Sequence, residues 1–196
     1  MDRYTLLTYL IVYLTVAFVL PTYRVWKRTG LNPVTFGGTD SAHDYVGMLF
    51  KMVMLILLLA TGARALLPAV DEYLIPISWL EIDLFRYVGY ALLLASLVWV
   101  VTAQVQMADS WRIGIDSSKT QLVSTGLFGV SRNPIFLGMM GTLLGLLLVL
   151  PNALTLTIFA LGFALMQIQV RLEEEFLRRS QEGEYEEYAN RVRRWL

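Results

Sequence analysis

Two short charged motifs in the C-terminal half of the sequence contain the residues best suited to binding a ligand. Arg132-Asn133-Pro134 precedes one apolar segment, and Arg171-x-Glu173-Glu174 follows the next apolar segment. Ionisable groups at the edge of a bilayer are costly unless they are solvated, paired or bound to a ligand. Because the two motifs flank one apolar hairpin, we predict that they meet at its mouth and form a binding site there.

The first motif also has the composition of a helix start. Asn is preferred at the N-cap, and Pro is favoured at the first helical position. A helix N-terminus presents unpaired N–H groups and a partial positive charge, which suit a carboxylate or another anionic group. Asn133-Pro134 therefore predicts both the start of a helix and a seat for an anion, which Arg132 would strengthen.

The glutamates of the second motif have two interpretations. Glu173, Glu174 and Glu175 form a solvated acidic patch where a helix leaves the membrane, or they face the first motif. Arg171 and Glu174 are three residues apart and so share a helical face. If the hairpin closes as its short turn implies, Glu173 lies opposite Arg132. A carboxylate there can bind a hydroxyl pair or an ammonium group of a cofactor.

The composition identifies the class of protein that must position these motifs. Of the 196 residues, 56 % are hydrophobic and 16 % are charged, and the mean hydropathy is +0.56. These values lie outside the usual balance of a soluble domain and predict an integral membrane protein. The sequence has no cysteine, so disulfides, thiolate nucleophiles and Cys-ligated metals are excluded.

Apolar windows long enough to cross the bilayer predict an all-α, polytopic membrane protein with about five transmembrane helices. The last two are joined only by Pro151-Asn152 and form a C-terminal helical hairpin, whose first helix is short enough to sit partly within protein. Residues 1–196 form a single membrane domain, with a helical scaffold over 1–108 and the loop, hairpin and C-terminal helix over 109–196. The predicted spans are 4–20, 46–67, 84–107, 135–150 and 153–170.

Three glycines form a stripe on the fourth span. Gly138, Gly141 and Gly145 are spaced by three and four residues, which lets another backbone approach closely. Helix packing is the favoured role, and close approach of a cofactor is the alternative.

The residues after the last span predict an amphipathic cytoplasmic helix at the membrane surface. It could equally fold back as a lid over the preceding loop, and the sequence does not choose between the two arrangements. Its apolar positions, at spacings near three and four, are Phe176, Leu177, Tyr185, Tyr188, Val192 and Trp195.

The distribution of basic residues predicts the orientation. With five spans, the first and third loops share one side with the C-terminal tail, and the positive-inside rule makes that side cytoplasmic and the N-terminus external. The opposite loop carries Asp71, Glu72, Glu81 and Asp83. The basic residues on the predicted cytoplasmic side are Arg24, Lys27, Arg28, Arg112, Lys119, Arg132, Arg171, Arg178, Arg179, Arg191, Arg193 and Arg194.

Four short motifs, in this order, resemble the isoprenylcysteine carboxyl methyltransferase and phospholipid methyltransferase family of membrane enzymes. They are Thr-Gly-Leu-Phe (125–128), Val-Ser-Arg-Asn-Pro-Ile-Phe (130–136), Arg-x-Glu-Glu-x-x-Leu (171–177) and Glu-Tyr-x-x-Tyr (184–188). The resemblance covers residues 105–196. It implies a methyltransferase that binds S-adenosylmethionine between the hairpin, the preceding loop and the C-terminal helix.

The family pattern Arg-His-Pro-x-Tyr differs from this sequence at two positions. Asn133 replaces the His and Phe136 replaces the Tyr. Asn still donates hydrogen bonds but does not titrate, and Phe offers a ring without a hydroxyl. The resemblance implies cofactor contacts from Arg132, Asn133, Pro134, Phe136, Glu173 and Glu174, and from the backbone near Leu122, Val123, Gly126 and Leu127.

Methyl transfer from a sulfonium makes modest demands on side chains, because alignment of the reactants and exclusion of water do most of the work. A carboxylate acceptor needs no base, whereas an amine must lose a proton to a carboxylate or to a lipid phosphate. Trp111 suits an interfacial anchor, and Arg112 beside it can hold a carboxylate or phosphate. The expected catalytic residues are Arg112, Arg171 and Glu174.

The implied acceptor is lipid-like or prenylated and enters laterally from the membrane lipids. Carboxyl O-methylation and lipid amine N-methylation both fit. Nothing in the sequence indicates nucleic-acid binding.

Two other classes of protein remain as alternatives. An NADPH-dependent membrane reductase of the sterol-reductase type shares a related C-terminal helical arrangement, although no extra basic cluster suits a 2′-phosphate. A non-enzymatic membrane protein would use the same charges only to anchor its helix ends. His43, between Asp40 and Asp44, could suggest a metal site, but a solvated polar loop is the favoured interpretation, and no metal is predicted.

Overall fold

The structure is a computed structural model of the 196-residue chain. It describes residues 3–30, 32–34, 40–108, 122–181 and 183–196. Within these ranges the chain forms helices and no strand, and an isolated bridge pairs Pro76 with Asn152. The all-α prediction is confirmed for the described residues.

The N-terminal rod consists of α1 (Tyr4–Leu14), the π-helical turn η1 (Thr15–Val19) and α2 (Leu20–Thr29). A π-helical turn changes the backbone hydrogen-bond register and commonly lies at functional sites. Here the Gln104 side chain reaches the turn and donates a hydrogen bond of 2.6 Å from Nε2 to the Ala17 carbonyl. The rod therefore continues as one helix and is fixed to a neighbouring helix at its midpoint.

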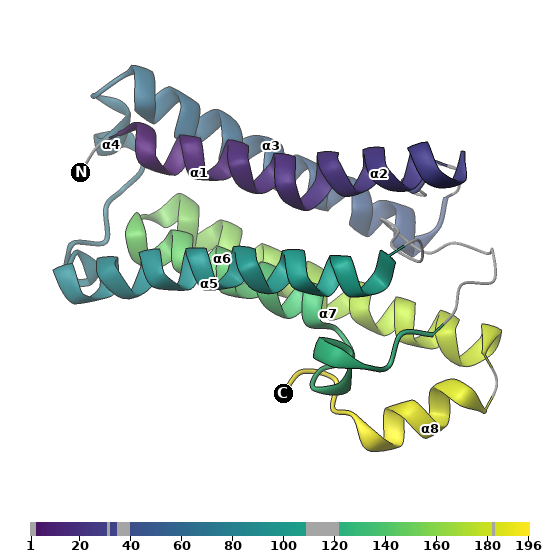
Figure 1. The fold of residues 1–196 in the computed structure, drawn as a ribbon. Helices are drawn as coiled ribbons and strands as arrows, with labels where there is room; N and C mark the ends of the chain where they lie inside the picture. The colour runs from purple at the N-terminus through teal and green to yellow at the C-terminus, as the bar shows by residue number, and fades with distance from the viewer. Residues whose placement is uncertain (1–2, 31, 35–39, 109–121, 182) are drawn as a thin grey trace.

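Helix α3 (Ala42–Leu66) lies beside the rod and also packs against the C-terminal hairpin. The hydroxyl of its N-cap residue, Ser41, accepts a hydrogen bond from the Asp44 N–H. After α3 the chain turns through the short helices α4 (Val70–Tyr73) and η2 (Ser78–Leu80). These turns lie at the same end of the bundle as the N-terminus (Figure 1).

Helices α5 (Asp83–Met107) and α6 (Pro134–Val149) are closely packed, and the glycines of α6 explain how. A Cβ at Gly138 would lie 2.5 Å from Val100 Cγ2, and one at Gly145 would lie 2.9 Å from Leu93 Cδ2. Residues larger than glycine would force the two helices apart, so the predicted packing role of the stripe is confirmed.

The hairpin predicted from Pro151-Asn152 is present, with α7 (Ala153–Ser180) as its second helix. The Asn152 side chain accepts a hydrogen bond from the Thr155 N–H at 2.9 Å, and the Thr155 hydroxyl accepts one from the Asn152 N–H at 3.2 Å. This reciprocal capping box starts α7 immediately after the turn.

Among the described residues, four helices are long and apolar enough to cross a membrane: Tyr4–Thr29, Ala42–Leu66, Asp83–Met107 and Ala153–Ser180. The predicted count of five spans is not confirmed, because α6 has only 16 residues. At 1.5 Å per residue such a helix is about 24 Å long, shorter than a hydrocarbon core of about 30 Å. Nine of its residues are buried in the protein, so α6 is an internal helix as its length suggested.

The remaining elements gather at the end of the bundle opposite the N-terminus (Figure 1). The 3₁₀ turn η4 (Gly126–Gly129) precedes α6, and α8 (Glu184–Arg191) follows α7. The predicted amphipathic helix is therefore interrupted. Its first residues extend α7 to Ser180, and the chain reverses at Gly183, which has φ +85°, before α8 begins. Both charged motifs lie at this end.

Candidate active site

A cavity of about 870 Å³ occupies this end of the molecule. Its walls come from the N-terminal rod, α3, the end of α5, residues 122–136, α7 and α8. One side is apolar and includes Phe18, Phe50, Met54 and Met139. Both halves of the chain contribute apolar residues to the lining, and the motif-bearing half contributes Arg132 and Glu173 to it.

The structure brings seven of the ten predicted cofactor-binding residues to this cavity. The other three, Gly126, Leu127 and Glu174, lie outside its lining. The seven that line it are Leu122, Val123, Arg132, Asn133, Pro134, Phe136 and Glu173.

Gly126 and Leu127 shape the loop that carries the lining residues. Gly126 has φ +62°, a left-handed conformation that favours glycine, and a Cβ there would lie 2.5 Å from Gln106 Nε2. The Leu127 N–H donates to Gln106 Oε1 at 2.8 Å. These two residues therefore hold η4 against the end of α5.

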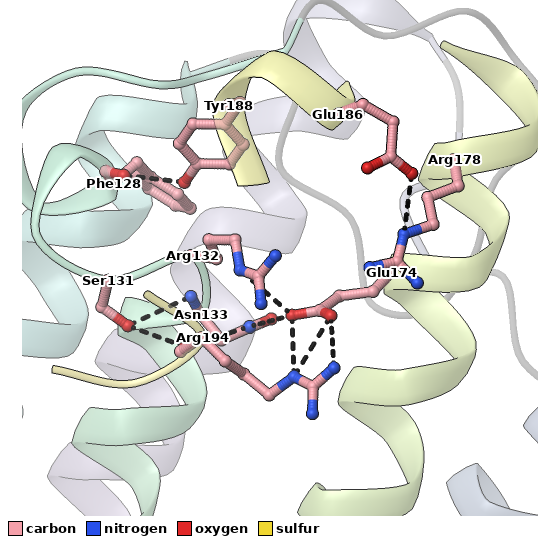
Figure 2. A network of polar contacts seen from close by, with 9 residues as sticks. All are labelled: Phe128, Ser131, Arg132, Asn133, Glu174, Arg178, Glu186, Tyr188 and Arg194. Carbon is pink, nitrogen blue, oxygen red and sulfur yellow. Dashed lines mark hydrogen bonds and ion pairs between the residues drawn. The ribbon is translucent and has the colours of Figure 1, made fainter. Parts of the chain in front are cut away.

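The Glu174 carboxylate is the centre of a buried polar network (Figure 2). Glu174 is 2 % exposed. Arg194 Nε donates to both carboxylate oxygens at 3.1 Å, and Arg194 Nη2 donates to Oε2 at 2.8 Å. Asn133 Nδ2 donates to Oε1 at 3.1 Å, and Arg132 Nε lies 3.5 Å from the same oxygen. Two guanidinium groups and an amide thus surround one carboxylate.

This network corrects the predicted pairing of Arg132 with Glu173. Consecutive residues of an α-helix point about 100° apart, so Glu173 and Glu174 cannot both face the start of α6. Glu174 faces it and pairs with Arg132. The anion at the start of α6 is therefore the carboxylate of Glu174, a residue of the protein itself.

Asn133 occupies the N-cap position of α6, and Pro134 is its first helical residue, as predicted. The Asn133 side chain makes no cap hydrogen bond, however. Its amide instead donates to Glu174 and, at 3.2 Å, to the Arg194 carbonyl. The side chain joins two other segments to the helix start rather than capping the helix.

The segment after α8 is held across the start of α6 by several hydrogen bonds. The Arg132 N–H donates to the Arg193 carbonyl at 2.9 Å, and the Ser131 hydroxyl donates to the Arg194 carbonyl at 3.3 Å. The hydrogen bonds and charge of Glu174 raise the pKa of the Arg194 guanidinium above its ordinary value, which keeps the pair ionised. We call residues 192–196 the C-terminal strap.

Glu173 has a different environment from its neighbour. Its carboxylate is half-buried, lines the cavity and accepts a hydrogen bond of 2.8 Å from Gln169 Nε2. Gln169 lies four residues earlier and so shares the same face of α7. Glu173 is the acidic side chain in the cavity lining, and it is placed to meet a ligand.

His43 lies in the first turn of α3 and contacts Gln169, a residue of the cavity lining. Its Nδ1 is 2.8 Å from Gln169 Nε2 and 3.2 Å from Gln169 Oε1. The interpretation of His43 as part of a solvated loop is therefore wrong. Among the described residues, no group of three or more His, Cys, Asp or Glu side chains is arranged to hold a metal ion.

Arg171, a second predicted catalytic residue, does not line the cavity. Arg171 is exposed, and its Nη1 donates to the Gln167 carbonyl and to Gln167 Oε1 on its own helix. It does not pair with Glu174 as its spacing suggested. Arg112 and Trp111 lie outside the residues that the structure describes.

Helix α8 folds back over the loop and closes one side of the cavity, the second of the two predicted arrangements. Tyr185 and Tyr188 are buried and contribute to the cavity lining. The Tyr188 hydroxyl donates to the Phe128 carbonyl at 2.7 Å, and Arg178 Nε lies 3.2 Å from Glu186 Oε1 (Figure 2). Burial, reinforced by the charge of Glu174, raises the pKa of Tyr185 to about 12, so this phenol is neutral.

Three residues of this site lie outside the sequence motifs. Arg194 is one of many basic residues on the predicted cytoplasmic side, Gln169 belongs to none of the motifs, and His43 lies in a segment predicted to be a polar loop. The i, i+4 spacing of Gln169 and Glu173 is a usable signal. The contact between α3 and α7 depends on the packing of segments that are distant in sequence, and no local sequence pattern predicts it.

The sequence matches a protein-family model. Residues 84–182 match the model of the family described as phospholipid methyltransferase, which is half of the chain and includes α5, η4, α6 and α7 with both charged motifs. A comparison with curated proteins gives no match. The extent of the family match shows that the chain belongs to the phospholipid methyltransferase family of membrane methyltransferases.

Proposed function

We propose that this protein is an S-adenosylmethionine-dependent methyltransferase that acts on an amphipathic or lipid-like acceptor at the cytoplasmic membrane face. The observation that carries the proposal is the cavity in which Asn133, Phe136 and Glu173 of the family motifs share a chamber with apolar walls. The family match supports methyl transfer, and the remaining parts of the proposal rest on the chemistry of that cavity.

The cavity is suited to a cofactor of this size and polarity. Ligand pockets typically have volumes of about 300–1,000 Å³, mostly apolar linings and a few converging polar groups. At about 870 Å³, this cavity lies in the upper part of that range, with room for an acceptor group as well. Phe136 offers a ring face, the segment at Leu122 and Val123 offers backbone groups, and Glu173 offers a carboxylate for an ammonium or hydroxyl pair.

S-adenosylmethionine would supply a methyl group on a positively charged sulfur, which is a good leaving group. The protein's task is to hold the acceptor in line with that methyl group and to exclude water. Tyr185 and Tyr188 of α8 contribute to exclusion because they are buried and border the cavity.

The apolar wall favours an acceptor that carries a hydrocarbon chain. Val19, Tyr23 and Trp26 of the N-terminal rod line the cavity, yet they are 59 %, 51 % and 54 % exposed. In a membrane-spanning helix such residues face lipid. They support a lateral route between the cavity and the bilayer, by which a lipid-like acceptor enters from membrane lipids.

The acidic residue of the cavity fits two acceptor chemistries. A carboxylate acceptor reacts without a base, whereas an amine acceptor must first lose its proton. Glu173 can accept that proton, because its carboxylate lines the cavity. The other predicted acceptor, Glu174, is already engaged by Arg132, Asn133 and Arg194. We therefore assign Glu173 to the ligand and Glu174 to positioning the surrounding segments.

Sidedness follows from the basic residues gathered at the cavity end. By the positive-inside rule this end is cytoplasmic and the N-terminus is external. A cytoplasmic cavity has access to the cytosolic pool of S-adenosylmethionine.

Calorimetric titration of the detergent-purified protein tests the proposal. S-adenosylmethionine and S-adenosylhomocysteine should bind saturably, and NADPH should not. Tritium from the methyl group of S-adenosylmethionine should then enter the lipid fraction of native-lipid nanodiscs. Binding of NADPH alone would contradict the proposal in favour of a reductase, and binding of neither by the folded protein would contradict enzyme function of either kind.

A further inference from the structure

We propose that His43 is a positioning residue for the Glu173 carboxylate and acts through the Gln169 side chain. His43 belongs to the N-terminal half, outside the residues 84–182 that match the family. The inference rests on the proposed function, because it concerns the carboxylate assigned there to the ligand. It adds a member of the site that the family motifs do not contain.

The hydrogen bonds form a continuous chain from α3 to the cavity. Gln169 Nε2 lies 2.8 Å from His43 Nδ1 and 2.8 Å from Glu173 Oε1. The nitrogen of one amide group thus lies between an imidazole nitrogen and a carboxylate oxygen. Gln169 and Glu173 both line the cavity, so the chain ends at the ligand site.

The chemistry of the amide makes this arrangement directional. The Gln169 amide nitrogen carries two hydrogens, which a carboxylate oxygen and the unprotonated nitrogen of a neutral imidazole accept. The proposal therefore places the imidazole proton of His43 on Nε2 and leaves Nδ1 as the acceptor. Rotation of the amide by half a turn would direct its carbonyl oxygen at the Glu173 carboxylate, where two acceptors would face each other. The His43 contact favours the orientation in which Gln169 donates to Glu173, and thereby limits the rotamers of both side chains.

The position of His43 is fixed by the helix that carries it. His43 is in the first turn of α3, just after the Ser41 cap, and α3 packs along α7. Loss of the imidazole would leave the helices packed but would release Gln169. His43 is thus expected to affect ligand affinity more than stability.

Four variants test the proposal, with S-adenosylhomocysteine as the probe. His43→Leu removes the imidazole. In His43→Asn, the side-chain amide oxygen is bonded to Cγ, as Nδ1 is in histidine, so an acceptor atom is kept at that position. Gln169→Leu breaks the chain at its centre. Tyr45→Leu is the matched control, because Tyr45 is an aromatic residue in the same turn, is 59 % exposed and is absent from the cavity lining.

Calorimetry on each purified variant should give the following pattern. His43→Leu and Gln169→Leu weaken binding about threefold to tenfold, the effect of one hydrogen bond. His43→Asn recovers most of the affinity, and Tyr45→Leu binds like the parent. The double variant His43→Leu/Gln169→Leu binds no more weakly than Gln169→Leu alone, since His43 acts through Gln169.

Two results would overturn the inference while the proposed function stands. In the first, the parent binds the probe and His43→Leu binds it with the same affinity. In the second, the losses of affinity in the two single variants add up in the double variant. If His43→Leu does not fold, the pair His43→Asn and Gln169→Leu decides, and equal affinity of Gln169→Leu and the parent overturns the inference. Absence of binding by the folded parent would overturn the proposed function, and this inference with it.

Discussion

Glu173 and Glu174 are consecutive residues of α7, yet their carboxylates have different partners and different surroundings. Glu174 is buried among Arg132, Asn133 and Arg194, whereas Glu173 accepts from Gln169 and lines the cavity (Figure 2 shows the Glu174 network). The helical step of about 100° between neighbours produces this separation. One glutamate holds the chain segments together, and the other is available to a ligand.

Glu174→Gln should lower stability. The substitution removes the charge that compensates Arg132, whose side chain is only 11 % exposed. Removing one partner of a buried ion pair costs about 3–5 kcal/mol, and we expect about 3 kcal/mol here because Arg194 is partly exposed. Intrinsic tryptophan fluorescence during thermal unfolding in detergent measures the effect. Glu175→Gln is the control, because Glu175 is exposed and pairs along its own helix with Arg179. Equal unfolding midpoints for the two variants would contradict the structural role.

Arg194→Gln should destabilise the C-terminal strap. Arg194 makes three hydrogen-bond contacts to Glu174 through its guanidinium group. Hydrogen bonds to charged groups contribute about 1.5–3 kcal/mol, and we expect a loss of about 1–2 kcal/mol, since the side chain is 31 % exposed. Arg193→Gln is the matched control, because the described contact of Arg193 uses its backbone carbonyl. Thermal unfolding in detergent measures both variants, and equal unfolding midpoints would contradict the role of the Arg194 guanidinium group.

Asn133→His should be tolerated, whereas Asn133→Leu should not. Histidine restores the residue of the family pattern, and an imidazole N–H can donate to Glu174 in place of the amide. Leucine is branched at Cγ like asparagine but has no donor, so Glu174 and the Arg194 carbonyl each lose a hydrogen bond. We expect Asn133→Leu to cost about 1–3 kcal/mol and Asn133→His less than half of that. Thermal unfolding would contradict this role if the order of the two variants were reversed.

The sequence predicts most of the helical framework, because the relevant signals are local. Apolar length identifies α3, α5 and α7, and Asn133-Pro134 and Pro151-Asn152 mark the ends of α6. The number of spans does not follow from the sequence, because α6 is as apolar as a spanning helix but has nine residues buried in the protein. Apolar composition alone does not distinguish lipid from protein surroundings.

The site is predicted less completely than the fold. Motif order identifies the start of α6 and the glutamates, but it does not specify the rotation of α7, which decides that Glu174 rather than Glu173 meets Arg132. The interruption at Gly183 has a local signal, the glycine itself, because glycine readily adopts the positive φ that the structure shows there. The positions of Arg194 and His43 arise from tertiary packing of segments distant in sequence, and only the structure supplies them.

The central claim is that the cavity binds an adenosyl cofactor and that Glu173 contributes to that binding. The most direct test is calorimetric titration of S-adenosylhomocysteine into the parent protein, Glu173→Gln and Glu175→Gln at a temperature where all three are folded. The account predicts saturable binding by the parent and by Glu175→Gln, with binding weakened about tenfold or more in Glu173→Gln, the loss expected for a hydrogen bond to a charged group. Equal affinities for the parent and Glu173→Gln, or no binding by the parent, would contradict it.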